Sequence, residues 1–352
     1  MTKAMLGHGA YDQNSGYQEK ASLSYESMLR DAGRQLQPTA GSNSVTIVDY
    51  GCAQGRVSNP LLATAITAFR EHDTDSRIFV CHNDQPSNDF AALLRNLAES
   101  GSYLRTVDGA DDSKAPGITP LICPVSFYEP VSPRDSVNLG MSFAAAQWLS
   151  RPGPGGTGTA LYFDQLDGVA QAQFSAQAHE DWTRFLSLRA DELVPGGLMI
   201  MDMMGVPDDG QAAGHELWEH LREIIASHAA AGRIDQTRLD GYVLPVFERT
   251  MQEALRPFEE ALAGRLNVES ASLRHVENPL KARYLADGDA PAFAEGFTAF
   301  ARAFSEPSLI EGLALDSETA DSIYRELETR LTVDADAFAF EVYPLTLAFR
   351  AS

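Results

Sequence analysis

A short β-branched run that ends in a glycine-rich turn constrains the fold of this chain more than any other feature. Residues 45–50 read Val-Thr-Ile-Val-Asp-Tyr, and the next residues give the spacing Asp49-x-Gly51-x-x-x-Gly55. A helical spacing then begins near Pro60. Glycine allows the backbone to turn sharply and lets a ligand approach it closely. This strand, turn and helix predict the first unit of an α/β domain with a ligand at the turn.

Strand and helix patterns continue to alternate as far as residue 204, which predicts a doubly wound, Rossmann-like α/β sheet of parallel strands. The further expected strands cover 77–84, 119–127 and 196–204, and the expected helices cover 19–36, 60–69, 88–97 and 178–193. Asn88 is the expected N-cap of the third of these helices.

After Gly205 the pattern becomes mostly helical, over residues 213–231, 246–264, 291–304 and 317–331, with weaker strand signals at 270–276 and 336–349. We therefore expect an α/β core over residues 1–206 and a helical cap over 207–263. Residues 264–352 are expected to complete the sheet and to add cap helices. The cap would lie over the carboxyl ends of the strands, where open α/β sheets bind their ligands.

Charge, cysteine content and hydropathy exclude several classes of function. The chain of 352 residues carries 27 Lys and Arg against 49 Asp and Glu, a net charge of -22, which disfavours nucleic acid and anionic membrane surfaces as partners. Neither the three cysteines nor the histidines show metal-ligand spacing, so no disulfide framework and no metal site is expected. Without a signal-peptide pattern or an apolar run of about 20 residues, a cytoplasmic location is expected.

The glycine turn itself favours a nucleoside ligand without phosphate groups. Cys52 and Ala53 interrupt the dinucleotide fingerprint G-x-G-x-x-G, and the chain has no P-loop. S-adenosyl-L-methionine (SAM) is a ligand of this kind. Asp84 ends the second expected strand, where a carboxylate can accept hydrogen bonds from two ribose hydroxyls. The simpler interpretation is that Asp84 caps the turn at Gln85.

Five stretches together resemble the SABATH methyltransferases, a plant-centred family that acts on salicylate, benzoate, jasmonate and theobromine-type substrates. They are Tyr11-x-x-Asn14-Ser15-x-x-Gln18, Asp49-x-Gly51-Cys52-x-x-Gly55, Asn83-Asp84-x-Pro86-x-Asn88-Asp89-Phe90, Ser126-Phe127-Tyr128 and Trp148-Leu149-Ser150. Their order and spacing match the family, and the pair Leu217-Trp218 fits its later region. The resemblance implies a class I methyltransferase fold, SAM as cofactor, S-adenosylhomocysteine (SAH) as product, a small carboxylic acid as substrate, and a homodimer.

The resemblance also implies site residues. Those that would contact SAM are Tyr11, Ser15, Asp49, Gly51, Cys52, Asp84, Gln85, Ser126 and Phe127. Gln18 and Trp148 match the pair whose side-chain N–H groups hold the substrate carboxylate, and Gln147, Leu217 and Trp218 match the pocket wall. Two departures matter. Val57 stands where the family has Asn, and Gln147 and Ala144 alter the acyl pocket, so no particular plant substrate is carried over.

The chemistry suits these residues, because a carboxylate is already ionised at pH 7 and needs no general base. Two neutral N–H donors would orient it without quenching its nucleophilicity. Apolar residues of the expected cap, among them Met203, Met204 and Phe247, suit an apolar substrate. Asp202 reads more simply as a solvated turn acid. Three rival functions stay open, namely an N-methyltransferase of a heterocycle, an NAD-dependent oxidoreductase and a non-catalytic SAM-binding protein.

Overall fold

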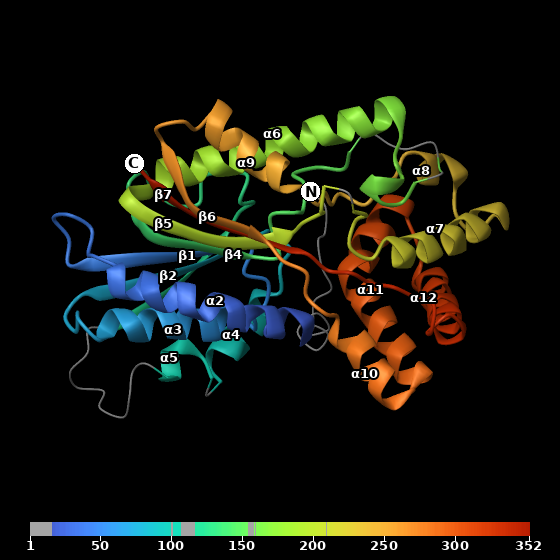
Figure 1. Cartoon of the computed structure of the whole chain (residues 1–352), viewed down its shortest axis with the longest axis horizontal. Coiled ribbons are helices and arrows are strands. Elements are labelled where there is room, and N and C mark those ends of the chain that lie inside the picture. The colour runs from blue at the N-terminus through green and yellow to red at the C-terminus, as the bar shows by residue number, and fades with distance from the viewer. Residues whose placement is uncertain (1–15, 100, 107–116, 154–157, 159, 209) are drawn as a thin grey trace.

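A seven-stranded sheet forms the centre of the molecule in the computed structural model (Figure 1). The described residues are 16–99, 101–106, 117–153, 158, 160–208 and 210–352, with side chains from Tyr25 onward except that of Thr106. The strands are β1 (Ser44–Tyr50), β2 (Arg77–Asp84), β3 (Ile118–Pro124), β4 (Val137–Phe143), β5 (Leu193–Met204), β6 (Leu266–Leu273) and β7 (Pro344–Ala351). The helices are α2 (Gly16–Gln35), α3 (Ser58–Arg70), α4 (Phe90–Leu97), α5 (Tyr103–Thr106), η1 (Phe163–Gln165), α6 (Gly168–Glu192), α7 (His215–Ala230), α8 (Gln236–Asp240), α9 (Met251–Glu260), α10 (Pro279–Asp287), α11 (Ala290–Leu313) and α12 (Ser317–Val333).

The strand order β3-β2-β1-β4-β5-β7-β6 confirms the expected Rossmann-like α/β fold. The first five strands of this order run parallel, and β7 runs antiparallel to both β5 and β6. The sheet is therefore mixed, whereas the sequence predicts parallel strands only. The chain enters β7 from the helices beyond the carboxyl ends of the parallel strands, so this last strand has to run back against β5 (Figure 1).

Helices cover both faces of the sheet (Figure 1). Helices α2, α3, α4 and α5 lie on one face, and α6 and α9 lie on the other. A Cβ at Gly33 of α2 would stand 2.2 Å from the carbonyl oxygen of Ala65 in α3, so the glycine permits this close helix contact. The strand β1 is buried on both sides, with Val45, Ile47 and Val48 fully inaccessible, as a central parallel strand requires.

Five helices, α7, α8, α10, α11 and α12, gather beyond the carboxyl ends of the parallel strands and form a cap (Figure 1). The cap has its own apolar core, in which Leu221, Phe297 and Tyr324 are almost fully buried. Helix α9 falls inside the segment 207–263 expected as cap, yet it packs against α6 and β6. Its Phe258 lies 5.2 Å from Phe349 of β7, centroid to centroid, because the apolar side of this helix faces the sheet.

Several local features differ from the predictions. The N-cap of α4 is Asp89, whose side chain accepts a hydrogen bond from the Ala92 N–H, and not Asn88. The expected strand at 336–349 begins only at Pro344, because Phe338 and Phe340 pack into the cap core. The strand β4 and the helices α5, η1, α8 and α10 were not expected. No helix within the described residues is long and apolar enough to cross a membrane.

Candidate active site

The glycine turn after β1 has the backbone that its sequence predicts. Gly51 and Gly55 have φ angles of +79° and +80°, in the left-handed region that glycine tolerates. A Cβ on Gly51 would stand 2.4 Å from the Cβ of Ala145, and one on Gly55 would stand 2.6 Å from Leu93 Cδ1. The Gly51 N–H donates to the carbonyl oxygen of Asn83 over 2.8 Å, which ties the turn to the end of β2.

Asp84 joins the same two strand ends from the other side. Its Oδ2 accepts a hydrogen bond from the Ala53 N–H, and its Oδ1 accepts one from the Gln85 N–H, both at 2.7 Å. Burial raises the pKa of Asp84 to about 6, and these two hydrogen bonds oppose that rise. Asp84 therefore caps the turn, as the simpler interpretation holds. Each carboxylate oxygen keeps a second lone pair for a ligand, so the ribose role stays a prediction.

Asp49, Cys52 and His82 meet beneath the turn. One potential ligand atom from each lies within 4.8 Å of the other two, and His82 Nδ1 lies 3.7 Å from Asp49 Oδ2. Burial holds the pKa of the Cys52 thiol well above its usual value, which favours the protonated thiol over the thiolate that binds metals. Spacing along the sequence does not predict this cluster, because His82 of β2 meets the segment that carries Asp49 and Cys52 only in the folded chain. The expectation that the protein binds no metal stays a prediction.

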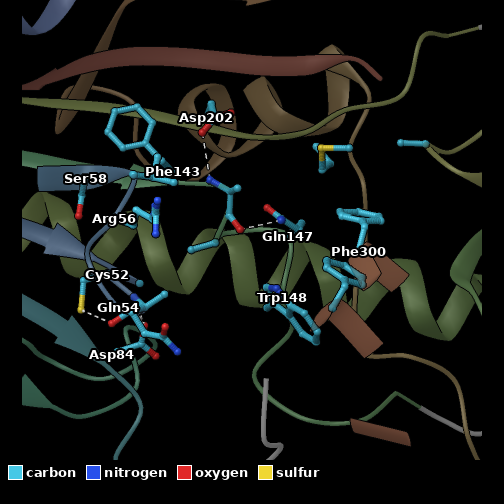
Figure 2. A pocket seen from close by; sticks show the side chains of 18 of the residues that line it. Cys52, Gln54, Arg56, Ser58, Asp84, Phe143, Gln147, Trp148, Asp202 and Phe300 are labelled. Atoms are coloured by element: carbon cyan, nitrogen blue, oxygen red, sulfur yellow. Dashed lines mark hydrogen bonds between the residues drawn. The ribbon is translucent and has the colours of Figure 1, made fainter. Parts of the chain in front are cut away.

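A single cavity of about 440 Å³ extends from the glycine turn to the cap. Figure 2 shows its turn side, with Cys52, Gln54 and Asp84, facing its cap side, with Trp148 and Phe300. Of the residues expected in the site, the described lining contains Asp49, Gly51, Cys52, Asp84, Gln85, Phe127, Gln147, Trp148 and Trp218. The structure thus brings together in one enclosure the residues expected to bind cofactor and those expected to bind substrate.

The loop after β4 presents Gln147 and Trp148 to this cavity and is held from two sides. The Tyr128 hydroxyl donates to the Trp148 carbonyl oxygen over 2.7 Å, and Trp148 forms a β-bridge with Val246. The Phe247 N–H donates to the Gln147 carbonyl oxygen over 2.9 Å. The backbone of the loop is therefore fixed, which positions the two side chains that it carries.

The Trp148 side chain is 5% exposed, and no acceptor for its indole N–H exists among the described residues. The indole ring itself packs against Phe304, at 4.9 Å between ring centroids. Gln147 donates to the Ala144 carbonyl oxygen over 2.7 Å, while its own Oε1 has no donor within the described part of the chain. The buried indole thus does not satisfy its N–H locally, unlike an ordinary core tryptophan.

Several expected site residues lie elsewhere. Ser126 is absent from the cavity lining, and its Oγ accepts a hydrogen bond from the Tyr128 N–H. Leu217 is fully buried in the apolar core of the cap and is absent from the cavity lining. Tyr11 and Ser15 lie outside the described residues. Gln18 belongs to α2, but its side chain also lies outside the described part, so the expected pairing with Trp148 stays a prediction.

The cavity also contains residues that sequence reasoning did not select. Asp202, expected to be a solvated turn acid, is instead buried at the end of β5 and lines the cavity (Figure 2). Its position near the carboxyl end of an expected strand could have indicated this, because ligands bind at that edge of an open α/β sheet. Arg56 lines the cavity beside the glycine turn. Val57, which replaces the family's Asn, also lines the cavity and packs against the apolar core. Glu248 lines the cap side, and no sequence pattern pointed to it.

Similarity to known proteins extends over nearly the whole chain. The family model described as SAM dependent carboxyl methyltransferase matches residues 2–347. The chain belongs to this family. Anthranilate O-methyltransferase 1 from Zea mays is 27% identical over 77% of this chain and 74% of its own length. The 3,7-dimethylxanthine N-methyltransferase TCS1 from Camellia sinensis var. assamica is 27% identical over 94% of this chain and 90% of its own.

A solved structure gives the same result for the fold. Loganic acid methyltransferase with SAH superposes with a TM-score of 0.77 at 18% identity and covers 99% of both chains. The family model confirms the resemblance to SABATH methyltransferases, and SAM is the cofactor. The site fits this cofactor, because Asp49, Ser58 and Gln85 line the cavity around the glycine turn and each has a buried oxygen without a hydrogen-bond partner among the described residues.

Proposed function

We propose that this SAM-dependent methyltransferase forms the methyl ester of a small, largely apolar or aromatic carboxylic acid. The observation that carries the proposal is the buried Trp148 indole N–H, which lines the cavity and has no acceptor within the described residues. A carboxylate oxygen of the substrate would satisfy this donor. An unsatisfied buried donor otherwise costs about 1–3 kcal/mol.

The charge distribution around Trp148 supports a reactive carboxylate. Arg56 and Arg283 are the two cationic side chains in the described lining, Arg56 lies beside the glycine turn, and Arg283 pairs with Asp287. A neutral N–H donor orients the carboxylate and leaves its negative charge available for attack. SAM, when bound, supplies an electrophilic methyl group on a sulfonium. The protein has to align the two reactants and exclude water, because the ionised acid needs no base.

The apolar wall supports a substrate with an aromatic or aliphatic body. Phe297, Phe300, Phe304 and Trp218 line the cap side of the cavity. Such a wall excludes water from the reacting atoms.

A homodimer is a further part of the proposal and rests on the family resemblance alone. Sedimentation of the full chain, whose monomer mass is 38.2 kDa, would test it.

A turnover screen tests the proposed reaction. Purified full-length protein is mixed with methyl-labelled SAM and a panel of aromatic, indolic and fatty acids. We expect label in a base-labile ester, and a fall of about 100-fold in kcat/KM for Trp148→Phe, since that variant keeps the ring packing but loses the N–H donor. SAH affinity should stay unchanged. Trp182→Phe is the matched control, because the Trp182 indole bonds to the Ala254 carbonyl oxygen between α6 and α9, away from the cavity.

Two outcomes would contradict the proposal. Label transferred to the nitrogen of a heterocycle, with no ester from any acid, would replace it with N-methylation. Equal ester formation by wild type and Trp148→Phe would show that the indole N–H does not hold the carboxylate.

A further inference from the structure

Glu248 is a buried carboxyl group on the mainly aromatic cap side of the cavity. Its side chain lines the cavity and is 2% exposed. Among the described residues no Lys, Arg or His forms an ion pair with it, whereas the buried Glu192 pairs with Arg189 at 3.0 Å. A buried carboxyl group without a counter-charge is costly, and such groups concentrate at functional sites.

Two donors hold the Glu248 carboxyl group in place. Oε1 accepts a hydrogen bond from the Tyr162 hydroxyl at 2.8 Å, and Oε2 accepts one from the Ala213 N–H at 2.7 Å. Burial raises the pKa of Glu248 to about 8, against these two hydrogen bonds. The group is therefore mostly a neutral carboxylic acid at pH 7. In that form it carries an O–H donor in addition to its acceptor oxygens.

A continuous row of aromatic rings connects Trp148 to Glu248. Ring centroids are 4.9 Å apart for Trp148 and Phe304, and 5.4 Å apart for Phe304 and Trp218. Tyr162 stacks on Trp218 at 4.9 Å and bonds to Glu248 through its hydroxyl. A substrate whose carboxylate bonds to Trp148 would thus lay its apolar body along these rings, with Glu248 at the far end of the row.

We propose that Glu248 is a polar subsite for the substrate and selects acids that carry a hydroxyl or amino group distant from their carboxylate. The inference rests on the proposed carboxyl methylation and names the class of acid. A distal hydroxyl donates to a Glu248 oxygen or accepts from its O–H. An acid without that group leaves the carboxyl group facing apolar atoms, and sites built to bond a hydroxyl reject analogues that lack it.

A purely structural role for Glu248 predicts a different result, because Glu248 also ties η1 to the start of α7. Under that role, removing the carboxyl group lowers the turnover of every acid alike. Under the proposal, removal changes the ratio of kcat/KM between matched acids. The ratio is therefore the informative quantity, and it is insensitive to the fraction of folded enzyme.

The experiment compares 3-(4-hydroxyphenyl)propanoic acid with 3-phenylpropanoic acid, and 4-hydroxybenzoic acid with benzoic acid. Wild type should prefer the hydroxylated member of at least one pair by about ten-fold, the value of one buried hydrogen bond. The double variant Tyr162→Phe/Glu248→Met removes the Glu248 carboxyl group together with the Tyr162 hydroxyl that bonds to it, and it should lose the preference. Tyr162→Phe alone is the matched control, and it should keep the preference because Glu248 is retained.

Each outcome decides the matter. A ratio that is the same in wild type and the double variant would overturn the subsite. If the double variant does not fold, wild type decides alone, since ester formation without any preference for the hydroxylated acids overturns the subsite as well. Failure to form an ester from any acid is a separate result, which would contradict carboxyl methylation itself.

Discussion

At the scale of single residues, the cavity is distinguished by carboxyl groups that are difficult to ionise. Asp84 is the last residue of β2, Asp202 lies near the end of β5, and Glu248 lies on the cap side. Burial raises the pKa of all three, to about 6, 6 and 8. The common cause is that apolar walls remove water from these groups. A cavity of this kind strengthens the electrostatic interactions of whatever it binds.

Asp202 makes this effect measurable as a dependence of stability on pH. Its Oδ2 accepts from the Tyr25 hydroxyl at 2.9 Å, and its Oδ1 accepts from the Ala144 N–H at 3.0 Å. Because its pKa is raised from 3.8 to about 6, the folded state binds the proton more tightly than the unfolded state. This group therefore lowers the free energy of unfolding as pH rises from about 4 to about 6, by up to about 3 kcal/mol.

We predict that Asp202→Asn is more favourable relative to wild type at pH 7 than at pH 4.5, by about 1–3 kcal/mol. Asn keeps an acceptor for Ala144 and can donate to the Tyr25 hydroxyl, so the shape of the site is kept. Urea unfolding at the two pH values measures the difference. Glu277→Gln, which removes the same charge from an exposed side chain, controls for the change in net charge. An equal difference between Asp202→Asn and wild type at both pH values would contradict the prediction.

At the scale of elements, the turn and its flanking strands were predictable, and the central strand β4 was not. The turn is recognisable because its left-handed backbone requires glycines, which the sequence shows. The strands β1 and β2 are recognisable as runs of β-branched or apolar residues. The strand β4 reads VNLGMSF. Its Asn138 and Ser142 break the apolar run, and its Gly140 leaves room for Met199, whose sulfur would stand 2.4 Å from a Cβ there. Its strand character comes from neighbours on both sides.

The cap side of the cavity was also predicted less well than the glycine turn, because several of its residues lack a recognisable local pattern. Trp148 lay within a recognisable local stretch, whereas Glu248 and the phenylalanines of α11 come from segments without one. They meet only because the cap folds over the sheet. The pattern of helical apolar residues on α11 predicts burial, but it does not tell a cavity wall from ordinary packing.

The glycine turn supplies a prediction at this scale. Gly51→Ala should weaken SAH binding at least ten-fold, because its Cβ would collide with Ala145 and displace the turn that faces the cavity. Gly41→Ala is a matched control, since Gly41 has the same φ of +79° and a Cβ there meets nothing within 4 Å. Both variants carry the strain of a left-handed alanine, about 1–2 kcal/mol. Calorimetric titration with SAH would reveal equal affinities if steric collision were unimportant.

At the scale of the whole molecule, the α/β sheet with its helices and the helical cap have separate apolar cores, and both line one cavity. The core beneath the glycine turn and the core of the cap are distinct clusters. The turn side presents polar backbone and carboxyl groups, and the cap side presents aromatic rings. This division matches the needs of the reaction, because a polar nucleoside and an apolar acid must meet with water excluded.

The division predicts that the two ligands protect different parts of the chain from hydrogen exchange. Ligands stabilise the segments that they contact against local opening. SAH alone should slow amide exchange in residues 51–58 and 84–89, which line the turn side. Addition of the methyl ester product of the best acid should extend protection to α11, whose Phe297, Phe300 and Phe304 line the cap side. Helix α12 contributes no residue to the described lining, so it serves as the internal control. Equal protection of α11 by SAH alone and by SAH with ester would mean that the cap responds to the cofactor and not to the acid.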